Sequence, residues 1–225
     1  MKYIIMCGGI STTWDTPRQL YEINGEAVVA RTIRLLRENG IEDISISSND
    51  ARFNQFGVPV LHHENNYVSA GYNKNTGLWC ECFYPTNEPT VYLHGDVVFS
   101  PAAIKKIIET ETKDIAFFGS KYPFAPEYPK WYIEPFGWKV VDTDHLKRAV
   151  EDVKRLDAQK RFGRQPIAWE VWNVISRGPD GDVNTIYDDY VVINDWTCDL
   201  DYPDEAHMME EIVRKYDPPS KKSDS

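Results

Sequence analysis

The chain has 225 residues, with 25 Lys or Arg against 35 Asp or Glu, so its formal net charge is −10. Hydrophobic residues make up 42%, an ordinary globular balance, and the length suffices for one sizeable core but is marginal for two. Proteins that bind nucleic acids usually carry a basic excess. The acidic balance therefore argues against a nucleic-acid partner, while it leaves a small phosphorylated substrate open.

No apolar run approaches the ~18 residues that a membrane span needs, so we expect no membrane partner. The first residues are interrupted too early by Cys7-Gly8-Gly9 to form a signal peptide. The other cysteines, Cys80, Cys82 and Cys198, lack the spacing of a zinc site. We therefore expect reduced thiols in a cytoplasmic protein.

Strand and helix patterns alternate over the first ~120 residues. Short apolar runs predict strands at 3–6, 44–47, 58–61, 91–93 and 115–118, and periodic segments predict helices at 26–39, 76–84 and 101–111. Gly40 supplies a helix stop, and Pro101 stands at a first helical position, where its missing N–H costs nothing. This alternation indicates a parallel sheet with helices on both faces.

The pattern changes after Ser120. The segment 121–139 is rich in proline and aromatic residues, with strand-like pieces at 131–133 and 138–141, followed by helices at 143–156 and 167–175, a last strand at 190–193 and a helix at 203–215. Trp169 and Trp172 share one helical face, which is more typical of a core than of a pocket. We expect one domain over residues 1–216 and a disordered tail over 217–225.

The loop Cys7-Gly8-Gly9 follows the first buried strand directly. Paired glycines let backbone N–H groups approach phosphate oxygens, and Arg18 can neutralise their charge. The loop has neither the lysine pattern of a P-loop nor the spacing of a dinucleotide-binding loop. On spacing alone, a plain strand-to-helix connection with a solvated arginine is equally compatible.

The connected set "IIMCGG" and "TPRQLYEINGEAVVARTIRLLRENGIEDISIS" resembles the N-terminus of sugar-phosphate nucleotidyltransferases and phosphocholine-type cytidylyltransferases. The resemblance covers roughly the first 120 residues and the region of Asp201. It implies a mixed, mostly parallel sheet sandwiched by helices, in a glycosyltransferase-A-like fold. In that family the loop at Cys7, Gly8 and Gly9 cradles the triphosphate, and Arg18 stands where a lysine is common. Arginine keeps the charge but changes the geometry.

Two acidic segments match family positions for Mg²⁺ ligands. Asp96 ends the motif His94-Gly95-Asp96 after a buried strand, where open α/β sheets bind their ligands. Aligned on Pro203, the second ligand is Asp201, with Asp199 as a substitute on the same side of an extended chain. Acidic residues at a turn or a helix N-terminus are the alternative interpretation.

The resemblance also assigns parts of the nucleotide and acceptor sites. The segment 65–79 resembles the family's Asn-Asn-x-x-Ser-Leu stretch beside the base, so Asn73, Asn75 and Thr76 are candidate nucleotide contacts. Residues 120–185 would form an acceptor-binding insertion. A basic stretch with Arg161 and Arg164 could hold the acceptor phosphate, although a solvated basic turn is commoner.

The sequence thus predicts a Mg²⁺-dependent nucleotidyltransferase. It would move a nucleoside monophosphate from an NTP, with CTP favoured, to a small phosphorylated acceptor and release pyrophosphate, with Arg18 and Asp96 as catalytic residues. Two alternatives stay open. One is a glycosyltransferase with Asp199-Leu200-Asp201 as its Asp-x-Asp metal motif, and the other is a non-catalytic nucleotide-binding module.

Overall fold

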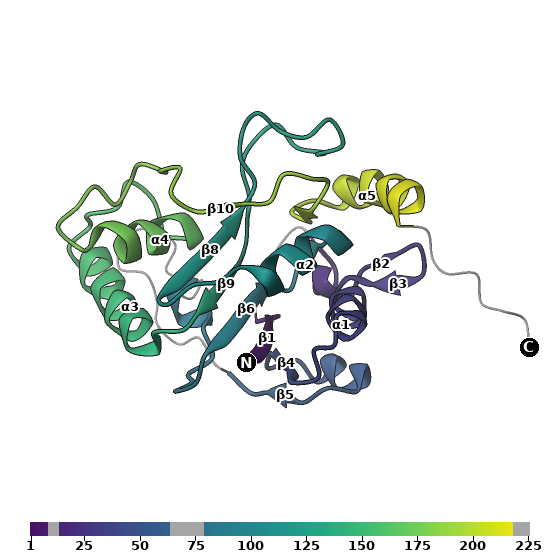
Figure 1. The fold of residues 1–225 in the computed structure, drawn as a ribbon, viewed down its shortest axis with the longest axis horizontal. Helices are drawn as coiled ribbons and strands as arrows, with labels where there is room; N and C mark the ends of the chain where they lie inside the picture. The colour runs from purple at the N-terminus through teal and green to yellow at the C-terminus, as the bar shows by residue number, and fades with distance from the viewer. Residues whose placement is uncertain (9–13, 64–78, 218–225) are drawn as a thin grey trace, which may run out of the picture.

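The computed structural model describes residues 1–8, 14–63 and 79–217. A seven-stranded sheet crosses the molecule in the order β10-β8-β9-β6-β1-β4-β5 (Figure 1). Its strands are β1 (Lys2–Met6), β4 (Ile44–Ser47), β5 (Val60–Leu61), β6 (Thr90–His94), β8 (Ile115–Gly119), β9 (Pro135–Val140) and β10 (Val191–Val192). Two short ribbons pair β2 (Glu22–Ile23) with β3 (Glu26–Ala27), and β7 (Val97–Val98) with β11 (Cys198–Asp199).

The sheet is mixed but mostly parallel, as the sequence predicted. Strand β1 lies next to the middle strand β6 and pairs in parallel with β4 and β6. The exception is β9, which runs antiparallel between β6 and β8. The chain therefore leaves the sheet after β8 through residues 120–134 and returns in the opposite direction as β9.

The two faces of the sheet follow from alternation along each strand. In β1, the side chains of Tyr3 and Ile5 pack in one buried cluster with the helices α1 (Val28–Glu38), α2 (Pro101–Glu109) and α5 (Pro203–Tyr216). Ile4 and Met6 pack in another cluster with α3 (Thr143–Ala158) and α4 (Ala168–Arg177). In Figure 1, α3 and α4 lie on one side of the sheet, and α1 and α2 lie on the other. Because both faces are covered, β1 reads as an uninterrupted apolar run.

Most helices begin and end where the sequence indicates. They are α1 (Val28–Glu38), α2 (Pro101–Glu109), α3 (Thr143–Ala158), α4 (Ala168–Arg177) and α5 (Pro203–Tyr216). The Ser100 side chain caps α2 by accepting a hydrogen bond from the backbone N–H of Ala103, with Pro101 at the first helical position. Trp169 and Trp172 of α4 are buried in the core, as expected.

Three local predictions differ from the structure. Helix α1 begins at Val28 and not at residue 26, because Glu26–Ala27 pairs with β2. The helix predicted at 76–84 is, within the described residues, the single 3₁₀ turn η3 (Trp79–Cys82). Residues 131–133 form no strand, because β9 begins at Pro135.

The predictions on membrane segments, on the cysteines and on the C-terminal tail can also be compared with the structure. Among the described residues, no helix is long and apolar enough to cross a membrane. All four cysteines are free thiols, and three of them are buried. The expected disordered tail falls almost entirely at 218–225, outside the described residues.

Candidate active site

A short ribbon brings two distant segments together at the carboxyl edge of the sheet. Strand β7 follows β6, and it pairs antiparallel with β11 from near the end of the chain. The backbone N–H of Leu200 then donates to the carbonyl of Asp96 over 3.0 Å. Val97, Val98 and Leu200 are fully buried, so apolar burial stabilises the ribbon. Asp96, Asp199 and Asp201 therefore lie in adjoining segments.

Gly95 makes the turn before Asp96 possible. A Cβ atom at this position would lie 2.5 Å from the Cys7 Sγ and 2.6 Å from the Met6 carbonyl oxygen. The backbone N–H of Gly95 instead donates to that carbonyl over 3.0 Å. The ends of β1 and β6 are thus held close together, and Asp96 projects beside the first loop.

Arg18 connects the two carboxylates that the sequence singled out. It begins the 3₁₀ turn η1 (Arg18–Leu20), and its guanidinium forms an ion pair with Asp96. Its NH1 atom lies 2.9 Å from Asp201 Oδ1 and donates to the Leu200 carbonyl over 2.9 Å. Because one guanidinium contacts both carboxylates, Asp96 and Asp201 lie within several ångströms of each other.

Lys130 forms the centre of a second charged cluster. Its Nζ lies 2.7 Å from Asp199 Oδ1, 3.0 Å from Glu134 Oε1, 3.1 Å from Asp201 Oδ2 and 3.4 Å from Glu205 Oε1. The lysine side chain is 3% exposed. Asp201 belongs to both clusters, since Arg18 holds one of its oxygens and Lys130 holds the other.

The pKa values in this cluster shift in opposite directions. Burial raises the pKa of Asp199 and of Glu134, and the neighbouring carboxylates add to that effect. Burial also tends to raise the pKa of Asp201, but Lys130 and Arg18 outweigh it and the pKa falls. For Lys130, the carboxylates outweigh burial and raise its pKa. The raised pKa values favour retention of protons on Asp199 and Glu134, whereas Asp201 stays ionised between two cations.

Backbone contacts fix the position of Asp201. Its N–H donates to Glu205 Oε2 over 2.6 Å, and the N–H of Tyr202 donates to the same oxygen over 3.1 Å. The Trp14 indole N–H donates to the Asp201 carbonyl over 3.0 Å. The acid therefore sits on a rigid support at the N-terminus of α5.

The donor set fits a divalent cation with hard oxygen ligands. Carboxylate oxygens of Glu134, Asp199 and Asp201 lie within 4.8 Å of one another, and Asp96 lies across Arg18 from Asp201. Mg²⁺ in nucleotide sites takes one or two carboxylates and leaves its other positions to phosphate and water. Asp96 and Asp201 meet that requirement in type and number.

A cavity of about 630 Å³ adjoins these residues. Its walls come from the end of β1, from residues 14–17 before Arg18 and from residues 48–52 after β4. Two wall residues, Cys7 and Trp14, contact the segments that carry Asp96 and Asp201. Its volume lies in the range of small-molecule sites.

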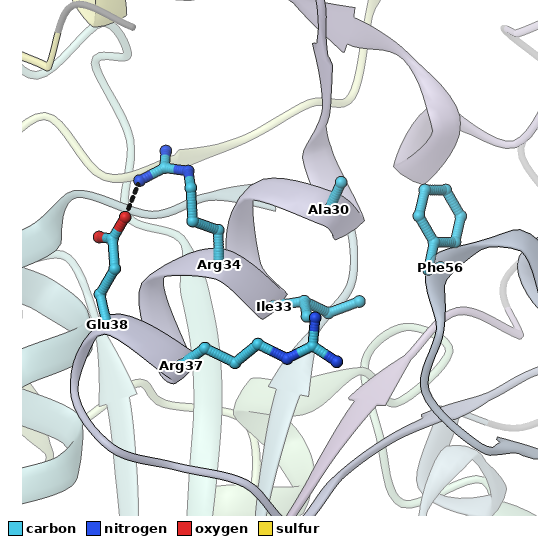
Figure 2. A pocket seen from close by; sticks show the side chains of 6 residues that line it. All are labelled: Ala30, Ile33, Arg34, Arg37, Glu38 and Phe56. Atoms are coloured by element: carbon cyan, nitrogen blue, oxygen red, sulfur yellow. Dashed lines mark hydrogen bonds and ion pairs between the residues drawn. The ribbon is translucent and has the colours of Figure 1, made fainter. Parts of the chain in front are cut away.

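A separate hollow has a volume of about 270 Å³. Figure 2 shows the side chains that line it, which are Ala30, Ile33, Arg34, Arg37, Glu38 and Phe56. All these residues except Phe56 belong to α1. Arg34 forms an ion pair with Glu38 over 2.9 Å, drawn as a dashed line. None of the site residues predicted from the sequence lines this hollow, so it offers no link to the chemistry at the sheet edge.

Several predicted contacts fall outside this description. Gly9, Asn73, Asn75 and Thr76 lie outside the described residues. Cys7 is buried and, with Gly8, lines the larger cavity.

In the basic stretch after α3, the Arg164 Nε lies 2.6 Å from Glu170 Oε1. That arginine therefore pairs with a carboxylate of its own neighbourhood.

The sequence reasoning missed the roles of Lys130, Glu134 and Glu205. A signal for the first two was present, because Lys130 and Glu134 are the charged residues in the otherwise aromatic and apolar stretch 128–138. Charged residues in such a stretch are seldom buried unless they are paired. Their partners on β11 could not be identified without the fold.

His94, beside the acid cluster, is a buried neutral base. One ring nitrogen bonds the backbone of Pro135, which has no N–H and can only accept. The other nitrogen, Nε2, is buried and has no hydrogen-bond partner among the residues that the structure describes. The neutral ring therefore carries its proton on Nδ1. Burial lowers the pKa of His94 to about 4, with only partial compensation from Asp96.

A family model described as a MobA-like NTP transferase domain matches residues 3–166, well over half of the chain. The chain belongs to this family. The nucleotidyltransferase resemblance seen in the sequence is thus confirmed at the level of the family. Among solved structures, the inositol-1-phosphate CTP transferase from T. maritima is similar, with 18% identity, coverage of 94% of this chain and 96% of that one, and a TM-score of 0.52.

Two further structures show the same fold. One is CMP:2-keto-3-deoxy-manno-octonic acid synthetase complexed with CTP, with 13% identity, 95% and 98% coverage and a TM-score of 0.57. The other is HddC from Yersinia pseudotuberculosis complexed with GMP-PN, with 13% identity, 93% and 98% coverage and a TM-score of 0.51. The predicted glycosyltransferase-A-like nucleotidyltransferase fold is confirmed by these likenesses.

The pKa of His94 predicts a loss of stability in acid. The unfolded imidazole has a pKa near 6.5 and takes up its proton before the folded one does, so the contribution of His94 to stability should fall as the pH drops from about 6.5 toward about 4. Between pH 7 and pH 5 this contribution changes by roughly 2 kcal/mol in the free energy of unfolding. The raised pKa values of Asp199 and Glu134 act in the opposite direction over the same range. Urea denaturation of the metal-free wild type and of a variant without the imidazole, at both pH values, therefore isolates the His94 contribution.

His94→Phe should remove that part of the pH dependence, because phenylalanine does not titrate and fits beside the Trp79 ring, whose centroid lies 5.2 Å from that of His94. The exposed His207 gives a matched control, and His207→Phe should keep the wild-type dependence. An unchanged difference between pH 7 and pH 5 in His94→Phe would show that His94 is not the titrating group.

Proposed function

We propose that this chain is a Mg²⁺-dependent nucleotidyltransferase that moves a nucleoside monophosphate, with CTP favoured, from an NTP to a small phosphorylated acceptor and releases pyrophosphate. One observation carries the proposal. Two carboxylates from distant segments, Asp96 and Asp201, meet on the guanidinium of Arg18 at the carboxyl edge of the sheet. Membership of the NTP transferase family supports the reaction class.

The proposed nucleotide position is the cavity beside Cys7 and Gly8. It adjoins the end of β1, and its rim at residues 14–17 leads directly to Arg18. CTP is favoured because one similar structure is that of a CTP transferase and another is that of a synthetase complexed with CTP. The base contacts that the sequence assigns to Asn73, Asn75 and Thr76 remain part of the proposal.

In the proposed reaction, a phosphate oxygen of the acceptor attacks the α-phosphorus of the NTP, and the bond to the pyrophosphate leaving group breaks. Mg²⁺, held by Asp96 and Asp201 with Asp199 as a substitute, would neutralise phosphate charge. A phosphate dianion is already a nucleophile, so the mechanism needs neither a covalent intermediate on the protein nor a general base. Catalysis then consists of positioning and charge stabilisation.

Arg18 has unused capacity for a phosphate. A guanidinium carries five N–H donors, and the contacts with Asp96, Asp201 and Leu200 use three of them. Within the described part of the chain, Nε and the second hydrogen on NH2 have no hydrogen-bond partner. The side chain is 23% exposed. Arg18 can therefore hold the acids and donate to a phosphate oxygen together.

The acceptor belongs, in this proposal, to the insertion formed by residues 120–185. This insertion contributes Lys130 and Glu134, whose side chains reach Asp199 at the edge of the proposed metal site. An acceptor bound against this segment would lie beside the proposed metal ligands. For this reason we propose a single domain in which residues 120–185 form an acceptor-binding insertion.

The reaction itself is tested by pyrophosphate release. The protein is incubated with Mg²⁺, each of the four common NTPs and a panel of phosphorylated alcohols, sugars and amino acids, and pyrophosphate is followed by a coupled assay. We expect acceptor-dependent release that is highest with CTP. A glycosyltransferase would release none, and nucleotide binding without turnover across the panel would indicate a binding module.

Arg18→Ala should lower kcat/KM about ten- to a hundredfold, since one charge-assisted phosphate contact contributes roughly 1.5–3 kcal/mol. Arg18→Lys should recover part of this loss, because it restores the charge without the planar fork. The control is Arg37→Ala, which removes an exposed arginine of α1. Normal binding and turnover of NTP by Arg18→Ala would rule out a phosphate cradle at this loop.

Asp96→Asn should keep the fold and lose most turnover, because an amide is a poor Mg²⁺ ligand. Asp201→Ala should raise the Mg²⁺ concentration needed for half-maximal rate as well as lower the rate, and Asp199→Ala should do so less. Initial rates across a Mg²⁺ titration measure this, with Asp144→Asn on exposed α3 as a control. Wild-type kinetics in Asp96→Asn would overturn its assignment as a metal ligand.

A further inference from the structure

The ammonium of Lys130 is buried, although the segment that carries it has no regular secondary structure. Residues 128–134 belong to no helix or strand, yet Lys130 is 7% exposed. Its Nζ lies within 3.4 Å of oxygens from four carboxylates, and 5.1 Å from the centroid of the Tyr132 ring. Lysine is almost never buried unless it is paired. Its burial therefore depends on the acids that it contacts.

Lys130 has fewer hydrogens to donate than there are acidic side chains around it. An ammonium has three hydrogens, and carboxyl groups of four residues lie within 3.4 Å of its Nζ. Removing such charges from water is expensive unless they are fully compensated. Arg18 compensates one oxygen of Asp201, but Asp199 and Glu134 share the lysine with the others. A cation of higher charge at this position would be better matched to the carboxylates.

The contacts of Lys130 coincide with the proposed metal ligands. Two of its four carboxylates, Asp201 and its substitute Asp199, are among the residues that the sequence assigns to Mg²⁺, together with Asp96. Their distances from Nζ, 2.7 and 3.1 Å, are those of hydrogen bonds, whereas oxygens bind Mg²⁺ at about 2.0–2.1 Å. The ammonium and the ion cannot occupy the same space among these oxygens.

We propose that Lys130 is a tethered counter-ion, which holds the acids together in the nucleotide-free protein and is displaced from Asp199 and Asp201 when the metal–nucleotide complex binds. This inference rests on the proposed function, since it assumes that these acids bind the metal. The flexible four-carbon stem of lysine permits such a movement without a change of fold. Once displaced, the ammonium is free to meet phosphate oxygens that the substrates bring.

Removing the charge should therefore increase metal affinity. Lys130→Met keeps an unbranched apolar stem but leaves the acids without their counter-ion. Binding of Mn²⁺ alone to the nucleotide-free protein, followed by electron paramagnetic resonance, should be tighter than in the wild type by about tenfold or more, because a unit charge no longer repels a divalent ion at close range. The melting temperature should be lower without metal and should rise more steeply with Mg²⁺.

A second buried lysine provides the control. Lys139 is 5% exposed, and its Nζ donates to the carbonyls of Ile108 and Thr110 over 2.8 and 2.6 Å, away from the acid cluster. Lys139→Met removes the same charge and should leave Mn²⁺ affinity within about twofold of the wild type. Equal affinity in Lys130→Met and the wild type, or weaker affinity in Lys130→Met, would overturn the counter-ion role.

A measurement on the wild type covers the case in which Lys130→Met does not fold. With ¹⁵N-labelled lysine, a buried hydrogen-bonded ammonium gives a distinct resonance, which Lys130→Arg would assign by its loss. This resonance should shift or vanish when Mg²⁺ and a non-hydrolysable CTP analogue are added. An unchanged resonance while the metal binds would overturn the inference. Failure of the wild type to bind Mn²⁺ even with nucleotide would instead count against the proposed function itself.

Discussion

Electrostatic repulsion among converging carboxylates is the constraint on which this site depends. Asp96, Glu134, Asp199, Asp201 and Glu205 lie together at one edge of the sheet, compensated by Arg18 and Lys130. The fold stabilises this arrangement from both sides of the chain, through the β7–β11 ribbon and the first turn of α5. A cluster that is costly to assemble and incompletely neutralised is well suited to bind a metal–triphosphate complex.

The sheet topology explains why these particular segments meet. Central strands β1 and β6 run in parallel and end side by side, which places Cys7 beside the turn that carries Asp96. The antiparallel strand β9 then lies against β6, so that the connection before it carries Lys130 and Glu134 to the same edge. Each part of the proposed site therefore comes from the end of a central strand or from a segment attached to one.

Local sequence signals were sufficient for most of the fold. Short patterns located β1, β4, β6 and β8 to within a residue. Strands β1, β6 and β8 are mainly continuous apolar runs, as expected of strands covered on both faces, whereas β4 alternates Ile with Ser. The signals failed where tertiary pairing decides the structure. Glu26 and Ala27 look helical but pair with β2, and residues 131–133 look strand-like but form part of a charged loop that the acids hold in place.

The residues of the candidate site, like the elements of the fold, could be predicted from the sequence only in part. Asp96 could be proposed from its position after a buried strand, and Asp201 from its place in a family motif. Lys130 and Glu134 could not, because their partners lie about 65 to 70 residues away and are reached only through the return of β9 and the β11 ribbon. Charges inside an aromatic stretch indicate that a partner exists, but sequence spacing does not say which.

The most direct test is a crystal structure with Mn²⁺ and a non-hydrolysable CTP analogue, in which anomalous scattering locates the ion independently of any model. The account predicts one manganese peak bonded to the carboxylates of Asp96 and Asp201 and to phosphate oxygens, with Arg18 against the triphosphate and Lys130 withdrawn from Asp199. A nucleotide bound elsewhere, or a manganese peak distant from these two carboxylates, would contradict it.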